Sequence, residues 1–138
     1  AKGLQRLHIL IENAAGLGTD MVTLCTGTRD PADQWNHHPD NASPEAWRDL
    51  LDEMAKACAL AEARGVKLGI EPELANVIDS APRARALIDT LQSPALVIVL
   101  DPANLFEVAP LQAQRDLLLD LVVVSPGSPG SLPGGGGY

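Results

Sequence analysis

Apolar residues recur at helical spacing in three stretches of the chain. In residues 3–15 they fall about three or four positions apart, and glycines at positions 16 and 18 end the pattern. Ser43 and Pro44 form a strong helix start, after which an apolar stripe runs without a break towards Gly65. The pattern therefore predicts three amphipathic helices, over residues 3–15, 44–64 and 80–91.

Short, continuously apolar runs separate these helices. They comprise residues 21–25, 66–70 and 95–100. Such runs are typical of strands that are covered on both faces. Because strands that alternate with helices form parallel sheets through right-handed crossovers, we predict an α/β fold with the order α-β-loop-α-β-α-β. A further helix is expected near residues 110–120.

Two segments depart from this alternation. Residues 26–42 are polar and rich in turn-forming residues, which predicts a long loop of the kind that often carries function. Residues 125–138 contain only Ser, Pro, Gly, Leu and Tyr, a composition typical of disordered chain. We therefore expect one folded unit over residues 1–116. The Gly/Pro/Ser-rich tail over residues 117–138 is expected to be disordered or read out of frame.

The composition excludes several classes of protein. Ten Lys and Arg face 18 Asp and Glu, so the net charge is −8 with His neutral. This acidity argues against a nucleic-acid partner, which would need a basic surface. No apolar run approaches the ~20 residues that span a bilayer, so no membrane partner is expected. Cys25 and Cys58 fall inside predicted elements, which indicates packed, reduced thiols in a cytoplasmic protein.

Two of the predicted strands end on an acidic residue. Glu71 follows the second strand and Asp101 follows the third, each with a proline directly after it. Ligands and catalytic groups of parallel α/β sheets collect at the carboxyl ends of the strands. Neighbouring strands would bring both carboxylates together as ligands for one divalent ion, such as Mg²⁺, Mn²⁺ or Zn²⁺. The alternative is that both acids merely end their strands and face solvent.

Four further residues are candidates for binding a substrate. Asn104 can donate an amide hydrogen bond to a substrate oxygen, or form an ordinary Asx turn. Glu73 is a candidate general base or a solvated loop acid. Trp35 can stack on the apolar face of a sugar ring, and Arg29 can donate to sugar hydroxyls or a phosphate. The alternative for both is a packed surface loop. His37 and His38 are adjacent in the sequence, which is poor geometry for chelating one ion.

Three sequence blocks resemble a known family. TLCTGTRDPADQWNHHPDN, LGIEPELANVIDSAPRARAL and VIVLDPANLF occur in this order, and residues 3–116 are similar to the central part of the xylose isomerase-like TIM barrel. More narrowly, they resemble bacterial sugar phosphate isomerase/epimerase proteins. The resemblance implies an incomplete (β/α)8 barrel, because a complete one needs about 250 residues and this chain supplies about three strands.

The resemblance also implies a metal site. In the family a divalent ion is held by a Glu, an Asp, a His and a second Glu that follow four different strands. Glu71 and Asp101 match the first two of these ligands. Many members carry a His at the position of Asn104 in this chain.

The implied activity is divalent-metal-dependent isomerisation or epimerisation of a sugar or sugar phosphate. Glu71 would move a proton between neighbouring carbons through an enediolate. Because the other two ligands would follow residue 116, we expect a truncated and inactive form. One alternative is a non-enzymatic fragment that is inert or binds weakly. The other is an endonuclease IV-like phosphodiesterase, which the acidic charge disfavours.

Overall fold

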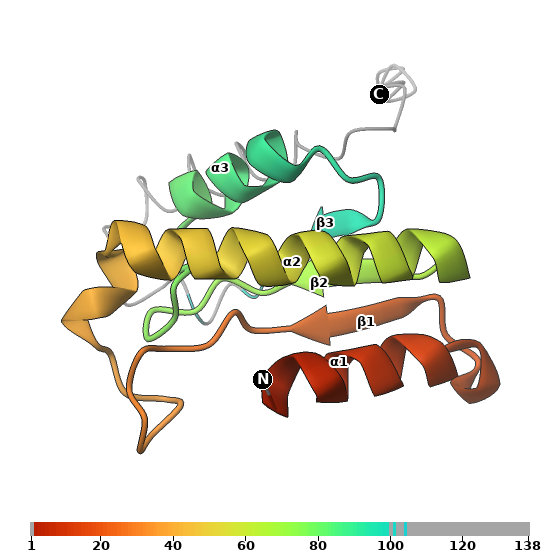
Figure 1. Cartoon of the computed structure of the whole chain (residues 1–138), viewed down its shortest axis with the longest axis horizontal. Helices are drawn as coiled ribbons and strands as arrows, with labels where there is room; N and C mark the ends of the chain where they lie inside the picture. The colour runs from red at the N-terminus through yellow and green to blue at the C-terminus, as the bar shows by residue number, and fades with distance from the viewer. Residues whose placement is uncertain (1, 100, 102–103, 105–138) are drawn as a thin grey trace, which may run out of the picture.

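The strands and helices alternate along the chain in the predicted order (Figure 1). The structure, a computed structural model, describes residues 2–99, 101 and 104. Its main elements are α1 (Lys2–Asn13), β1 (Met21–Leu24), α2 (Pro44–Arg64), β2 (Lys67–Ile70), α3 (Ala81–Leu91) and β3 (Leu96–Ile98). Two short 3-10 helices, η1 (Ala15–Leu17) and η2 (Pro39–Ala42), lie in the connections. The α/β fold class is therefore confirmed.

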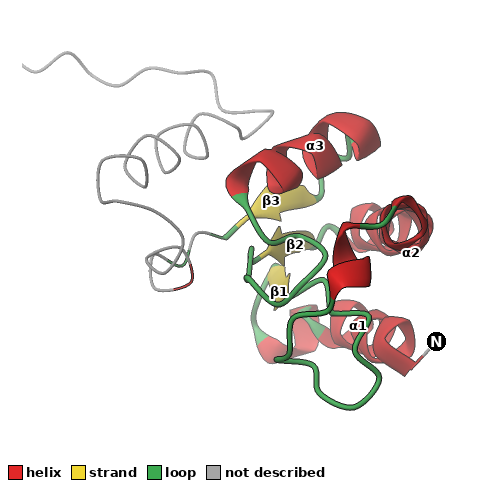
Figure 2. Ribbon diagram, turned by 90° about the vertical axis from the view of Figure 1, so that its left-hand side faces the viewer, coloured by secondary structure: helices red, strands yellow, loops and turns green. Residues whose placement is uncertain are grey.

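The three strands form one parallel sheet in the order β1-β2-β3. Leu24 pairs with Ile70, and Ile70 pairs in turn with Ile98. Figure 2 shows that α1, α2 and α3 all lie on the same side of the sheet. The carboxyl ends of the strands therefore meet at one edge, as in one sector of a barrel.

The long helix α2 is fixed at both ends by local chemistry. The Ser43 hydroxyl accepts a hydrogen bond from the N–H of Ala46 at 3.1 Å, and Pro44 begins the helix. At the other end Gly65 adopts φ 65°, where its N–H reaches the last carbonyl groups of the helix. A residue with a side chain is strained in this left-handed conformation, so glycine stops the helix and turns the chain into β2.

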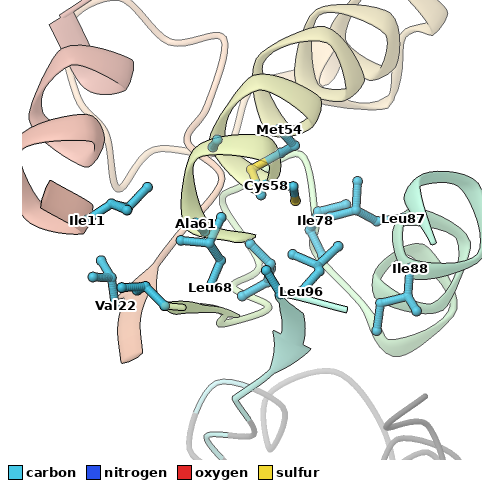
Figure 3. Close-up of a cluster of buried hydrophobic side chains, with 14 of the residues drawn as sticks. Ile11, Val22, Met54, Cys58, Ala61, Leu68, Ile78, Leu87, Ile88 and Leu96 are labelled. Atoms are coloured by element: carbon cyan, nitrogen blue, oxygen red, sulfur yellow. The ribbon is translucent and has the colours of Figure 1, made fainter. Parts of the chain in front are cut away.

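The hydrophobic core lies between the sheet and the helices (Figure 3). Leu68, Ile70 and Leu96 come from the strands, and each is at most 1% exposed. The helices pack aliphatic and sulfur-containing side chains against them: Ile11, Met54, Ala57, Cys58, Ala61, Leu87 and Ile88. On α2 three of the four are small, namely Ala57, Cys58 and Ala61, which lets this helix approach the sheet closely.

Some predicted boundaries differ from those of the structure. Cys25 is exposed and follows the last residue of β1, so the prediction of a packed cysteine inside a strand is wrong there. The apolar character of residue 25 does not distinguish the end of a strand from its interior. Both thiols are free. The predicted loop 26–42 contains η2, whose first residue, Pro39, has a φ that suits a helix start.

Several expectations concern residues that lie outside the part of the chain that the structure describes. These are the helix near residues 110–120, the domain boundary after residue 116 and the tail over 117–138. Within residues 2–99, 101 and 104, no helix has both the length and the apolar character needed to cross a bilayer.

Gly69 occupies the face of β2 that points away from the helices, because its neighbours Leu68 and Ile70 point into the core. A Cβ at this position would lie 2.5 Å from Cγ2 of Val99 and 3.3 Å from Cγ2 of Thr23. Side chains from both neighbouring strands thus fill the space over the glycine. Valine is stiff about χ1 and cannot move aside easily.

We therefore expect Gly69→Ala to lower the free energy of unfolding by about 1–3 kcal/mol, as overpacking does. The measurement is urea unfolding followed by circular dichroism. Gly3→Ala is the matched control, since nothing lies within 4 Å of its added Cβ. In a helix that change stabilises by about 0.5–1 kcal/mol. Equal stability of both variants would contradict the close packing over β2.

Candidate functional site

The ends of the three strands are aligned by the ladder of the sheet. The N–H of Glu71 donates to the carbonyl of Leu24 at 3.0 Å, and the N–H of Val99 donates to the carbonyl of Ile70 at 2.9 Å. Glu71 therefore continues the pairing of β2 with β1, and Val99 continues the pairing of β3 with β2. Asp101 comes three residues after the end of β3 at Ile98. Both acids thus follow adjacent parallel strands, as the sequence predicts.

Asn104 joins the ends of β2 and β3. Its side-chain amide donates to Oε1 of Glu71 at 2.8 Å and approaches the carbonyl of Pro72 at 3.4 Å. Its backbone N–H donates to the carbonyl of Asp101 at 3.2 Å. The amide therefore holds one oxygen of Glu71 and leaves Oε2 for another partner. The predicted contact of Asn104 with a substrate remains a prediction beside this observed role.

Cys25 lies beside the acids at the end of β1. Although the residue is exposed overall, partial desolvation of its thiol raises the pKa, and the negative charges of Glu71 and Glu73 raise it further. The thiol also lines a pocket of about 380 Å³ between α1, β1 and α2. Analysis of the sequence missed this residue as part of the site because it was assigned to the interior of a strand.

Two loops rise above this edge of the sheet and are bonded to each other. They are the β1–α2 loop, residues 25–43, and the β2–α3 loop, residues 71–80. The N–H of Val77 donates to the carbonyl of Gly27 at 2.9 Å. The N–H of Ile78 donates to the hydroxyl of Thr26 at 3.0 Å. Each loop therefore positions the other.

Asn76 is buried at 2% exposure and connects both loops to an acid. Its Oδ1 accepts from the N–H of Gly27, and its Nδ2 donates to Oε2 of Glu73. The N–H of Ala75 donates to the same oxygen of Glu73 at 3.0 Å. The carboxylate of Glu73 is thus held in one orientation by two donors, and its predicted role as a general base or substrate contact stays a prediction.

Asn41 forms a second buried connection, at 4% exposure. Its Nδ2 donates to the carbonyl of Ala75 at 2.8 Å, and its Oδ1 accepts from the N–H of Arg29 at 2.7 Å. The short helix η2 carries this side chain between the loops. A buried amide that uses its donors and acceptors on two segments is a specific structural link.

Trp35 stands at the tip of the β1–α2 loop and is 65% exposed. It lines a pocket of about 610 Å³ together with His37, Glu73 and Asp79. The pocket lies between the two loops, and its Glu73 comes three residues after β2 ends at Ile70. The structure thereby brings two of the predicted substrate contacts, Trp35 and Glu73, to one cavity.

Arg29 is placed differently. Its guanidinium forms an ion pair with Asp49 of α2 at 2.5 Å, so the predicted contact with a substrate would compete with this pair. Arg83 of α3 is also engaged, because its Nε donates to the carbonyl of Val77 at 2.8 Å. Its guanidinium carbon lies 5.0 Å from the ring centre of Trp47. Both cations therefore fasten loops to helices.

Comparison with known proteins identifies the family to which the chain belongs. The profile of the xylose isomerase-like TIM barrel family matches residues 1–125. The chain belongs to the xylose isomerase-like TIM barrel family. A solved xylose isomerase-like TIM barrel protein from Mycobacterium smegmatis, in complex with magnesium, superposes with a TM-score of 0.72 at 19% sequence identity. A search of curated proteins found no match.

The comparison also measures how much of a barrel is present. The superposition covers 88% of this chain and 42% of the Mycobacterium smegmatis protein. The chain therefore spans less than half the length of this xylose isomerase-like structure. The fold of the described residues is that of a partial TIM barrel.

Carboxylates are suitable ligands for a hard divalent ion, so Glu71 and Asp101 fit such a group in the chemistry of their donors. Within the described part of the chain, no three His, Cys, Asp or Glu residues are grouped closely enough to hold a metal. These two acids therefore offer at most part of a coordination shell. The remaining ligands would be water, substrate or residues beyond the description.

We expect Asn41→Ala to lower the free energy of unfolding by about 1–3 kcal/mol, because the carbonyl of Ala75 and the N–H of Arg29 would lose buried partners. Urea unfolding with an unchanged m-value measures the effect. Gln34→Ala, an exposed change in the same loop, is the control and should stay within about 0.5 kcal/mol of the parent. If the two variants were equally stable, the link between the loops would have no energetic weight.

We expect Glu71→Gln to increase the reactivity of Cys25 towards a disulfide reagent near neutral pH by a few-fold. A neighbouring anion disfavours the thiolate, so removing that charge lowers the thiol pKa and raises the thiolate fraction. Buried Cys58 should react only on unfolding. Glu45→Gln, at the exposed start of α2, should leave the rate unchanged. An unchanged rate in Glu71→Gln would show that the Glu71 carboxylate does not influence the Cys25 thiol.

Proposed function

We propose that this chain carries part of the active site of a divalent-metal-dependent sugar isomerase or epimerase. The observation that carries the proposal is the placement of Glu71 and Asp101 after adjacent parallel strands, with Asn104 bonded to both ends. Membership of the family, which includes isomerases, epimerases and endonuclease IV-like proteins, supports it.

In the proposed site Glu71 and Asp101 would hold the metal. A divalent cation supplies Lewis acidity, which makes the hydrogen on the carbon beside a sugar carbonyl more acidic. Glu71 accepts that proton and returns it to the neighbouring carbon, so no net proton is gained or lost. Asn104 fixes Oε1 of the same carboxylate and thereby orients Oε2. The identity of the metal, Mn²⁺, Mg²⁺ or Zn²⁺, is left open by this donor set.

The substrate in this proposal is a small hydroxylated molecule. Trp35 offers an exposed indole face on which a sugar ring can stack, and Glu73 offers a carboxylate that can accept hydroxyl protons. Asn76 and the N–H of Ala75 hold Glu73 for that contact. Arg29 would contribute only if its pair with Asp49 opened.

The charge of the site favours this reading over phosphodiester hydrolysis. The two loops carry six carboxylates and one guanidinium within residues 26–42 and 71–80. A DNA backbone approaching these loops would meet negative charge, whereas nucleic-acid enzymes present basic grooves.

We expect the chain to bind Mn²⁺ weakly at one site, and Glu71→Gln or Asp101→Asn to weaken binding by at least about tenfold. The electron paramagnetic resonance signal of free Mn²⁺, titrated against the chain, gives the affinity. Each acid removed takes away one of two protein ligands.

Glu45→Gln serves as the matched control, since it removes one carboxylate far from the strand ends. It should bind Mn²⁺ like the parent. Binding that survives both Glu71→Gln and Asp101→Asn would place the metal elsewhere. Absence of binding by the folded parent chain would favour the inert fragment over the proposed site.

A further inference from the structure

We propose that the pocket of about 610 Å³ between the two loops binds an amino group of an unphosphorylated sugar. The inference deepens the proposed function and rests on it for the sugar, while the preference for an ammonium over a phosphate rests on the pocket itself. The residues that decide it are Trp35, His37, Glu73 and Asp79.

The pocket shares a short stretch of the chain with the proposed metal site. Glu73 lies in its wall and is two residues from Glu71. Trp35 and His37 reach it from the β1–α2 loop, and Asp79 reaches it from the β2–α3 loop. Buried Asn76 fixes the orientation of the Glu73 carboxylate, so this wall is preorganised before any ligand binds.

The charges that surround the pocket are predominantly negative. Neither Glu73 nor Asp79 belongs to an ion pair among the described residues. Of the groups that line the pocket, the carboxylates of Glu73 and Asp79 are negative, and only the imidazole of His37 can become positive. A phosphate would be repelled by this field, whereas an ammonium would be attracted.

The cations that a phosphate would need are already in use. Arg29 pairs with Asp49 at 2.5 Å, and Arg83 is bound to the carbonyl of Val77 and lies against Trp47. No Lys or Arg is among the residues that line the pocket. Phosphate sites usually contain a free guanidinium or ammonium for charge-assisted hydrogen bonds.

The N-terminus of α3 also reaches the pocket, through its N-cap Ser80. Such an end attracts negative charge. Here Asp79 already supplies a carboxylate at that end, and Pro82 in the first turn has no N–H to offer. The N-terminus of α3 therefore does not provide a binding site for a phosphate in addition to the Asp79 carboxylate.

Trp35 completes the selection of a cation. An exposed indole face attracts an ammonium through its quadrupole and also packs against the apolar face of a sugar ring. With Glu73 and Asp79 beside it, the pocket combines the groups that bind a protonated amine. An uncharged sugar would keep the stacking and its hydroxyl hydrogen bonds to the carboxylates, but would lose the attraction between opposite charges.

The test compares glucosamine with N-acetylglucosamine, which removes the positive charge, and with glucosamine 6-phosphate, which adds the disputed group. The full chain is used with a chelator present, so that metal binding has no influence. In a Trp47→Phe background Trp35 is the sole tryptophan and its fluorescence reports the pocket. Circular dichroism verifies the fold of this variant, and ligand-observed NMR on the parent chain gives the same comparison without the substitution.

We expect glucosamine to bind, and N-acetylglucosamine and glucosamine 6-phosphate to bind at least about tenfold more weakly, a difference of about 1.4 kcal/mol. Asp79→Asn should weaken glucosamine by about as much, while Asp52→Asn on the exposed side of α2 should have no effect. Trp35→Phe, which leaves only Trp47, should abolish the fluorescence response.

Equal or tighter binding of the phosphorylated or acetylated sugar would overturn the proposal, and so would the absence of any binding. Because the experiment excludes metal, its failure is distinct from a failure of the Mn²⁺ titration. A chain that binds Mn²⁺ through Glu71 but no amino sugar would retain the proposed site and lose this inference.

Discussion

The position of β2 between two parallel neighbours is the constraint on which the site depends. Its backbone is hydrogen bonded on both sides, to β1 through Leu24 and to β3 through Val99. This ladder brings the ends of three strands to one edge, where Glu71 and Asp101 follow. Gly69 allows the side chains of the adjoining strands to close over β2. The positions of Glu71 and Asp101 therefore depend on this central strand.

Above that edge, two buried amide side chains hold the two loops together, as the backbone hydrogen bonds hold the strands together. Asn41 and Asn76 each bond to both loops, and Asn76 also fixes Glu73. Their side chains hydrogen bond to backbone groups of the loops, which would otherwise be buried without partners. The loops therefore behave as a single layer attached to the sheet, with a fixed base near Glu73 and an exposed tip at Trp35.

The sequence predicted the elements well because their signals are local and repeated. The helical stripe of α2, its Ser43 start and its Gly65 stop each act within a turn, and the apolar runs identify the strands. It also placed Glu71 and Asp101 at strand ends. The long-range bonds of Asn41, Asn76 and Asn104 could not be predicted, because each joins residues 12 or more positions apart that only the fold brings together. Cys25 was misjudged for a similar reason, since residue type does not mark where a strand ends.

The different anchoring of the base and the tip of the β1–α2 loop has a consequence for how such a protein diversifies. Around Trp35 the bonds are short-range: Asp30 accepts from Ala32 and Asp33, and these contacts hold the pKa of Asp30 below its ordinary value. Nothing in this tip supports Glu73, which depends on Asn76 instead. Substitutions at the tip could therefore accumulate and alter which molecules are accepted, while the groups proposed for chemistry keep their geometry. In such a loop, the choice of ligand can change through substitution while the proposed catalytic residues stay in place.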